Sequence, residues 1–188
     1  MKHTKKREKI NNQGLTLIEL IVTIAIIGIF GVVVMSFVTS GANFYRQASD
    51  ASTVQRSMQM TLDQIENLVI DTNKSISYSV GGQATQSDLG SQDSQEKILI
   101  LESVQGENTQ HKEILKWNPD EKKLYCNYNS DRATDMKVMA ENISAFSADI
   151  SQAVSDGIVR FQITIQKKDK EMTQTYTVTL RNQLGADS

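Results

Sequence analysis

One acidic residue, Glu19, lies inside the most apolar part of this 188-residue chain. No charged residue follows it between positions 20 and 38. A carboxylate in a membrane-type segment is energetically costly unless a partner compensates its charge, so such a residue is a functional candidate by default. The chemistry that this placement allows is ion pairing, and we predict that Glu19 pairs with a cationic group near the membrane.

The other residues of chemical interest do not form an enzyme-type pattern. The two histidines, His3 and His111, have no neighbouring ligand pattern for zinc, and His111 is expected in a solvated turn. Asp88 and Asp93 have a spacing that fits no calcium-binding loop, so we expect a solvated loop there. Cys126 is the one cysteine, which excludes an intrachain disulfide and favours a small buried residue in a strand. No G-x-S-x-G motif and no Gly-rich phosphate loop is present, so we predict no enzyme activity, cofactor or metal.

The element that must position Glu19 is a membrane helix. Residues 15–38 are 24 mostly apolar residues, about 36 Å of helix at ~1.5 Å per residue, enough for a hydrocarbon core of roughly 30 Å. Many are β-branched, but in lipid a lone span must satisfy its backbone internally and is therefore helical. Gly28 and Gly31 thin the helix, which allows either flexibility or close helix approach.

Charge asymmetry sets the expected orientation. Residues 1–14 carry a net charge of +4 and the remainder −6. The positive-inside rule places the N-terminus in the cytoplasm and the chain after residue 40 outside, as a single pass of the cytoplasmic membrane. We interpret the basic end as a leader and predict no direct binding of nucleic acid.

Two simpler interpretations of this segment compete, and Glu19 has an alternative of its own. A secretory signal could be cleaved after Ala42, which would leave Asn43 as the N-terminus, but the apolar run is too long and leaves no place for Glu19. An ordinary signal anchor of an extracytoplasmic binding domain explains the length and orientation only. Glu19 itself could lie at the helix end and extend to the lipid headgroups.

The sequence GLTLIE at residues 14–19, after a basic leader and before about 20 apolar residues, resembles the processing site of type IV pilins and pseudopilins. The resemblance covers roughly residues 7–40. It implies cleavage after Gly14 by a membrane prepilin peptidase, which N-methylates the new first residue, Leu15. Glu19 matches the acidic residue at the fifth mature position, which in this family pairs with the N-terminal amine of a neighbouring subunit. Leu15 departs from the phenylalanine usual in major pilins.

The resemblance also implies the partners and the location of the chain. The partners are the prepilin peptidase and methyltransferase, other pilins or pseudopilins, a membrane assembly platform and the lipid bilayer. The mature subunit is stored in the membrane and then assembled into a filament. On a helix, residues four apart share a face, so the Leu15 amine is expected one turn from Glu19.

The sequence predicts an α+β fold, with one long N-terminal helix packed on a mostly antiparallel sheet. We divide it into a leader at 1–14, a transmembrane and assembly helix at 15–40, its amphipathic continuation at 41–70, a polar loop at 71–96 and a β-rich head at 97–188. The loop leaves room for one short strand at 76–80. The continuation carries apolar residues at helical spacing: Phe44, Ala48, Ala51, Val54, Met58, Leu62, Ile65 and Val69.

About six strands are expected in the head. They are placed at 97–104, 113–117, 122–128, 138–150, 157–166 and 173–180. Turns at 118–121 and 167–170 join two hairpins, and Trp117 is expected to meet Tyr125 across the first one.

A weaker resemblance concerns the C-terminal part of the chain. A strand with the pattern of residues 141–146, a final hairpin and an Arg181-Asn182 ending are similar to J-type minor pseudopilins and to PilW-like or ComGF-like minor pilins. This favours a minor subunit at or near the tip of a type IV pilus, type II secretion or competence filament. The major filament subunit is the alternative.

Overall fold

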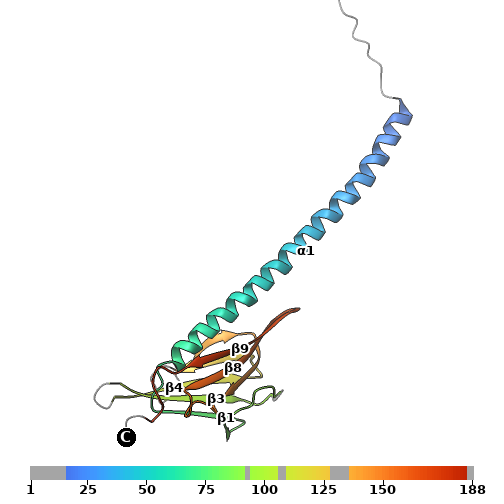
Figure 1. The fold of residues 1–188 in the computed structure, drawn as a ribbon. Helices are drawn as coiled ribbons and strands as arrows, with labels where there is room; N and C mark the ends of the chain where they lie inside the picture. Colours follow the sequence, from blue (N-terminus) through green and yellow to red (C-terminus); the bar gives the residue numbers. More distant parts are fainter. Residues whose placement is uncertain (1–15, 92–93, 106–108, 128–135, 186–188) are drawn as a thin grey trace, which may run out of the picture. The chain divides into compact units, whose positions relative to one another are not determined.

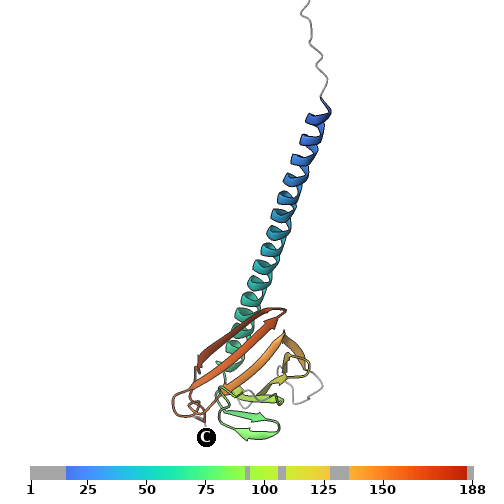
Figure 2. The ribbon, with the colours of Figure 1, turned by 90° about the vertical axis from the view of Figure 1, so that its right-hand side faces the viewer.

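The computed structural model describes residues 16–91, 94–105, 109–127 and 136–185 (Figures 1 and 2). It comprises two compact units, which divide between residues 47 and 48. The described elements are one helix and nine strands: α1 (Leu17–Val69), β1 (Ser75–Val80), β2 (Gln83–Thr85), β3 (Lys97–Gln105), β4 (Thr109–Asn118), β5 (Lys123–Asn127), β6 (Lys137–Glu141), β7 (Ile143–Asp149), β8 (Ile158–Lys167) and β9 (Lys170–Thr179).

The first half of α1 buries none of its side chains in the protein. Its large apolar residues are strongly exposed, for example Leu17 at 76% and Phe37 at 76%. A helix that is apolar all round and exposed all round needs an apolar solvent or a partner. Among the described residues, α1 is the one helix that is long and apolar enough to cross a membrane, by length and composition.

The second half of α1 packs on the sheets through one face. Val54, Met58, Leu62, Ile65 and Val69 are buried at steps of three and four residues, as the sequence predicted. The predicted face was too long toward the N-terminus, because Phe44, Ala48 and Ala51 are exposed. The buried face therefore begins at Val54.

The strands form two antiparallel sheets, which confirms the expected α+β class. The larger sheet has the order β2-β1-β3-β4-β5-β6, and the smaller has the order β7-β8-β9. Figures 1 and 2 both show β8 and β9 beside the second half of α1. Two side-chain contacts fasten this sheet to the helix: Tyr176 with Glu66, and Lys168 with Asp50 at 2.9 Å. The core contains side chains from α1 and both sheets.

The segment expected as a polar loop, 71–96, contains two strands. β1 and β2 are joined by Gly81 and Gly82, both with positive φ (57° and 82°). A two-residue Gly-Gly connection is typical of a tight hairpin, because its backbone requires φ values that other residues adopt at a cost. At Gly81 an added Cβ would also lie 1.9 Å from Gln95 Oε1. The Gly81-Gly82 pair is the sequence feature from which this hairpin could have been predicted.

The single strand predicted at 138–150 is two strands that belong to different sheets. β6 ends at Glu141, Asn142 has a positive φ of 63°, and β7 begins at Ile143. Asn142 is one of the few non-glycine residue types that adopt this backbone conformation readily. The reversal at Asn142 therefore transfers the chain from the larger sheet to the smaller one, and the 141–146 pattern is not one strand.

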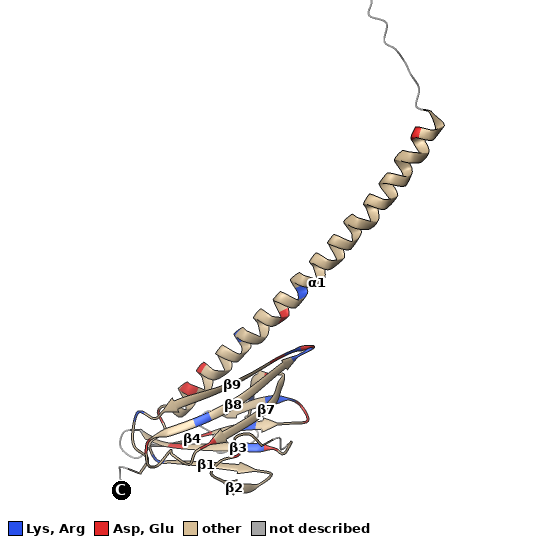
Figure 3. Cartoon of the chain, turned by 45° about the vertical axis from the view of Figure 1, so that its right-hand side comes forward, with Lys and Arg blue, Asp and Glu red and all other residues tan. Residues whose placement is uncertain are grey.

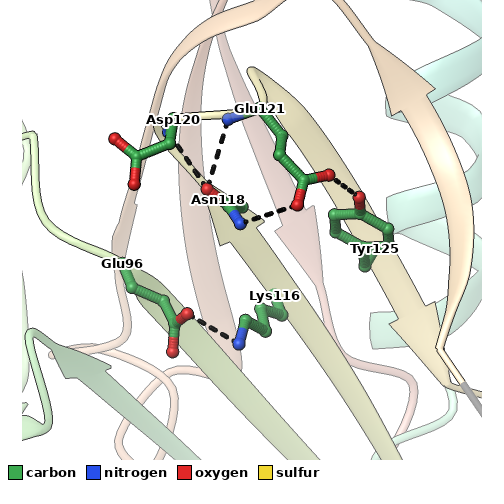
Figure 4. A network of polar contacts seen from close by, with 6 residues as sticks. All are labelled: Glu96, Lys116, Asn118, Asp120, Glu121 and Tyr125. Atoms are coloured by element: carbon green, nitrogen blue, oxygen red, sulfur yellow. Dashed lines mark hydrogen bonds and ion pairs between the residues drawn. The ribbon is translucent and has the colours of Figure 1, made fainter. Parts of the chain in front are cut away.

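The predicted turn at 118–121 is present, and its contacts are drawn in Figure 4. Asn118 Oδ1 accepts hydrogen bonds from the backbone N–H groups of Asp120 (3.0 Å) and Glu121 (3.3 Å), which is how asparagine stabilises turns. The prediction that Trp117 meets Tyr125 is wrong. Trp117 pairs with Leu124 in the β4–β5 register, so Tyr125 lies on the opposite face and donates to Glu121.

A short segment, residues 86–88, connects the two sheets. Ile150 N–H donates to Gln86 O (2.7 Å) and Asp88 N–H donates to Ala148 O (3.1 Å), so the segment pairs with the end of β7. Ser87 and Asp149 form a β-bridge between these bonds. The segment directly follows β2 and thus continues from the larger sheet to the edge of the smaller one.

Asp149 makes this connection pH-sensitive. A hydrogen bond from the Ser151 hydroxyl, with further ones from the Ser151 N–H and Ser87, holds the pKa of Asp149 below its ordinary value. A carboxyl whose folded pKa is depressed stabilises the fold above its unfolded pKa of about 3.9 and loses that contribution as the pH falls through the folded pKa. Asp149→Asn is expected to flatten this acid-side decline in the free energy of unfolding, measured by urea denaturation. Asp120→Asn, in an exposed turn, is the control, and an unchanged decline in Asp149→Asn contradicts the prediction.

The last described residues fasten the end of α1. Arg181 N–H donates to Ile70 O (2.9 Å), and Gly185 N–H donates to Asn73 O (3.1 Å). Val178 and Leu180, just before them, are buried in the core. The C-terminal segment thus lies against the exit of the helix and completes the packing there.

Candidate functional site

The N-terminus of α1 is closed by a reciprocal contact between Thr16 and Glu19. Helix α1 begins at Leu17, which makes Thr16 the N-cap and Glu19 the third helical residue. Glu19 Oε2 accepts hydrogen bonds from the Thr16 N–H (2.9 Å) and the Thr16 hydroxyl (2.8 Å), and the Glu19 N–H approaches the Thr16 Oγ1 at 3.4 Å. This is a capping box, in which N-cap and third residue satisfy each other's backbone donors.

The box uses only one oxygen of the Glu19 carboxylate. Within the described part of the chain, the hydrogen bonds from Thr16 to this carboxylate both end on Oε2. A carboxylate has room for about four donors, so Oε1 remains able to accept from a further group. The arrangement fixes the side chain by its own helix while it leaves one oxygen for a cation.

Thr16 was not singled out by sequence reasoning, although the pattern T-x-x-E before an apolar run is a known signal of a capping box.

The capping role of the Thr16 hydroxyl can be tested by substitution. Thr16→Val, which keeps the shape of the side chain but removes the hydroxyl, is expected to destabilise the helix N-terminus by about 0.5–2 kcal/mol. Amide hydrogen exchange of the chain in detergent micelles should show faster exchange in the first turn. Thr16→Ser is the matched control, and protection equal to wild type in Thr16→Val would refute a capping role.

The helix beyond Glu19 has no charge until Arg46, and Figure 3 shows this uncharged stretch of α1 between its first turn and its middle. Its hydroxyl groups bond to the backbone of the preceding turn: Thr23 to Glu19 O (2.6 Å), Ser36 to Val32 O (3.0 Å) and Thr39 to Met35 O (2.9 Å). Unpaired polar groups are costly in lipid, so this internal pairing suits an apolar environment. Glu19 is the one carboxylate among the described residues of the first unit.

Comparison with known families supplies the decisive observation. Residues 9–38 match the family model described as the prokaryotic N-terminal methylation motif. The chain has a type IV pilin-like N-terminus. No curated protein and no solved structure matches the chain.

The motif supports the coarse features of a type IV pilin-like subunit. Chains of this kind are membrane-anchored, are processed by a peptidase and assemble with other pilins as structural subunits. Of the predicted site residues, Glu19 lies in the capping box just described. Gly14, Leu15 and the whole leader, including His3, lie outside the described residues.

The other residues considered for chemistry lie apart from this site. His111 is in strand β4 opposite Ser103, where a turn was expected, because β4 begins at Thr109. Cys126 is buried in β5, as predicted. Asp93 falls outside the described residues. Among the described residues, no group of three or more His, Cys, Asp or Glu side chains could hold a metal ion.

Asp88 is not a solvated loop residue. Its side chain is 8% exposed and forms an ion pair with Lys97, whose side chain is 2% exposed. Sequence reasoning missed this pair, although Lys97 alternates with the buried Leu99 and Leu101 and therefore points to the same side of β3. Tyr78 donates to Asp88 at 2.8 Å. Burial, and then the hydrogen bond to Asp88, raise the pKa of Tyr78, so it stays a protonated donor.

Proposed function

We propose that the chain is a minor pilin or pseudopilin that is stored in the membrane and polymerises through its N-terminal helix. The observation that carries the proposal is the capping box at the start of α1, where residues 20–45 carry no charge and residues 9–38 match the methylation motif. It presents one carboxylate oxygen, held in place, at the end of the helix where maturation creates an amine.

The proposed maturation supplies the cationic partner. Cleavage after Gly14 removes residues 1–14 and leaves Leu15 with an α-amino group, which is mostly cationic near neutral pH because its pKa is about 8. Thr16 keeps its N–H after this cleavage, so the capping box can persist in the mature chain. Glu19 Oε1 then accepts from an amine, that of its own Leu15 or that of a neighbouring subunit. We favour the neighbour, since that contact joins subunits.

The same proposal assigns the remaining segments. Residues 15–40 anchor the subunit in the cytoplasmic membrane, with the leader in the cytoplasm and the chain after residue 40 outside. Residues 41–70 continue the helix, and 71–96 together with 97–188 form the extracytoplasmic head. The partners are the peptidase, sibling pilins and a membrane assembly platform.

A minor subunit is favoured over the major one by Leu15, by the absence of proline from residues 15–70 and by the large strand-rich head. One observation that favoured a J-type, PilW-like or ComGF-like subtype no longer holds, because Asn142 divides the 141–146 pattern between two strands. We therefore propose a minor subunit of a pilus, secretion or competence filament, placed at or near its tip, and assign no subtype.

The test is the N-terminus of the native protein, determined by mass spectrometry. Cleavage after Gly14 gives N-methyl-Leu15. Paired variants sharpen the result: Gly14→Lys is expected to block maturation, whereas Ala42→Lys, which disrupts the alternative secretory site, is expected to leave it unchanged. An N-terminus at Asn43 that is lost in Ala42→Lys would replace the proposal by a cleaved secretory signal. An intact Met1 in all three chains would favour the signal anchor.

A further inference from the structure

Lys97 and Asp88 form an ion pair in the interior of the head. Lys97, at the start of β3, lies between Val80 of β1 and Trp117 of β4 in the larger sheet. Asp88 belongs to the segment 86–88 that pairs with β7 of the smaller sheet. Two buried opposite charges lose the solvation that each had in water, and their attraction repays this loss only in favourable geometry.

The surroundings hold the Lys97 side chain in one place. Its Nζ lies 5.4 Å from the centroid of the Trp117 ring, a distance at which a cation is attracted to an aromatic face. The Trp117 ring is itself fixed, because its Nε1–H donates to Ile143 O at 3.0 Å. The amine therefore meets the carboxylate with little freedom to move away.

The two oxygens of Asp88 have different environments. Oδ1 accepts hydrogen bonds from the Tyr78 hydroxyl (2.8 Å) and the Ala148 N–H (2.9 Å). Oδ2 faces Lys97 Nζ and accepts no hydrogen bond from the described part of the chain. Two donors on Oδ1 can stabilise negative charge that develops on this oxygen in a tetrahedral intermediate of acyl transfer. Lys97 Nζ lies beside the other oxygen of the same carboxyl group.

We propose that Lys97 and Asp88 condense into an intramolecular isopeptide bond between Lys97 Nζ and Asp88 Cγ. This modification joins β3 of the larger sheet covalently to the segment 86–88, which pairs with β7 of the smaller sheet. The proposal does not depend on the proposed function, because it uses only residues of the head.

The reaction balances without an external reagent. A proton moves from the Lys97 ammonium to Asp88 Oδ2, which gives a neutral amine and a carboxylic acid. Nζ then forms a bond to Cγ, and the negative charge that develops on Oδ1 is stabilised by the Tyr78 hydroxyl and the Ala148 N–H. A second proton passes from Nζ to the Oδ2 hydroxyl. The Cγ–Oδ2 bond breaks, one water leaves, and Oδ1 becomes the amide oxygen.

The first experiment is intact-mass spectrometry of the full chain, purified in detergent. The bonded chain is lighter by one water than its sequence requires. Digestion with a glutamate-specific protease locates the bond, because cleavage after Glu96 separates Asp88 from Lys97 in an unbonded chain. In the bonded chain, residues 97–102 stay attached to the fragment that contains Asp88.

Matched variants assign the roles. Lys97→Met is expected to restore the full mass, whereas Lys116→Met, which removes a half-buried lysine paired with Glu96, keeps the loss of water. Tyr78→Phe keeps the ring but removes a donor to Oδ1, so bond formation after synthesis should slow by roughly 10²-fold. Tyr125→Phe, which removes an exposed hydroxyl bound to Glu121, should form the bond at the wild-type rate.

The result that overturns the proposal is a wild-type chain of full mass whose fragments separate completely after cleavage at Glu96. Lys97 and Asp88 are then a buried ion pair only. This result is measured on the wild-type chain, so it remains valid even if Lys97→Met fails to fold. An equal rate of bond formation in Tyr78→Phe and wild type would remove Tyr78 from the mechanism and contradict the assigned stabilisation of Oδ1.

Discussion

Glu19→Ala is expected to leave the chain in the membrane and to lower its incorporation into filaments at least about tenfold, which corresponds to ~1.4 kcal/mol. Insertion depends on the length and apolarity of the helix, and removal of a carboxylate makes it easier. Under the proposed function, assembly depends on the pairing of Glu19 with an amine. Immunoblots of membranes and of sheared filaments, from cells that express each variant at equal levels, measure the two quantities separately.

Glu19→Gln separates the charge of this residue from its capping role. The amide oxygen can still accept the two hydrogen bonds from Thr16, but it carries no charge to attract an amine. Assembly is therefore expected to be impaired in Glu19→Gln to the same extent as in Glu19→Ala. Thr23→Val is the control, since its hydroxyl bonds only to Glu19 O in the described structure. Normal assembly of both Glu19 variants would contradict the pairing with an amine. Glu19 would then only extend its side chain to the lipid headgroups.

Phe161→Ala is expected to have the largest effect on the head. Phe161 is fully buried in β8, the central strand of the smaller sheet, with its ring centroid 6.1 Å from that of Phe146. Removal of a buried phenylalanine side chain costs about 3–5 kcal/mol, a large share of the roughly 5–15 kcal/mol that stabilises a domain.

Urea denaturation of the full chain in detergent, followed by tryptophan fluorescence of Trp117, measures this change. The matched control is Val154→Ala, because Val154 is 75% exposed and its truncation should change the free energy of unfolding by no more than about 0.5 kcal/mol. Equal unfolding midpoints for the two variants would show that the core does not depend on Phe161.

The parts of the fold that depend on local periodicity were predictable. The helix ends at Val69, one residue before its predicted limit, and five of the eight stripe residues are buried. β3, β8 and β9 match their predicted ranges within a few residues, because alternation marks strands with one buried face. Glu19 could be found for a similar reason, since a lone charge in an apolar run stands out.

The features that sequence reasoning missed depend on contacts between distant residues or on single backbone angles. Nothing local to Asn142 separates one strand from two, because the reversal there is needed only to reach the second sheet. Asp88 lies in a stretch of small polar residues and is buried only by pairing with Lys97 and the end of β7. The Trp117–Tyr125 error came from the register, since a shift of one residue moves a side chain to the other face.

The contact between the C-terminal segment and the exit of α1 has a consequence for the order of synthesis. Val178 and Leu180 are core residues, and Arg181 and Gly185 bond to the chain just after the helix. A ribosome synthesises these residues after α1 and after β1–β8. The packing at the exit of α1 therefore cannot be completed before β9 and the residues that follow it have been synthesised.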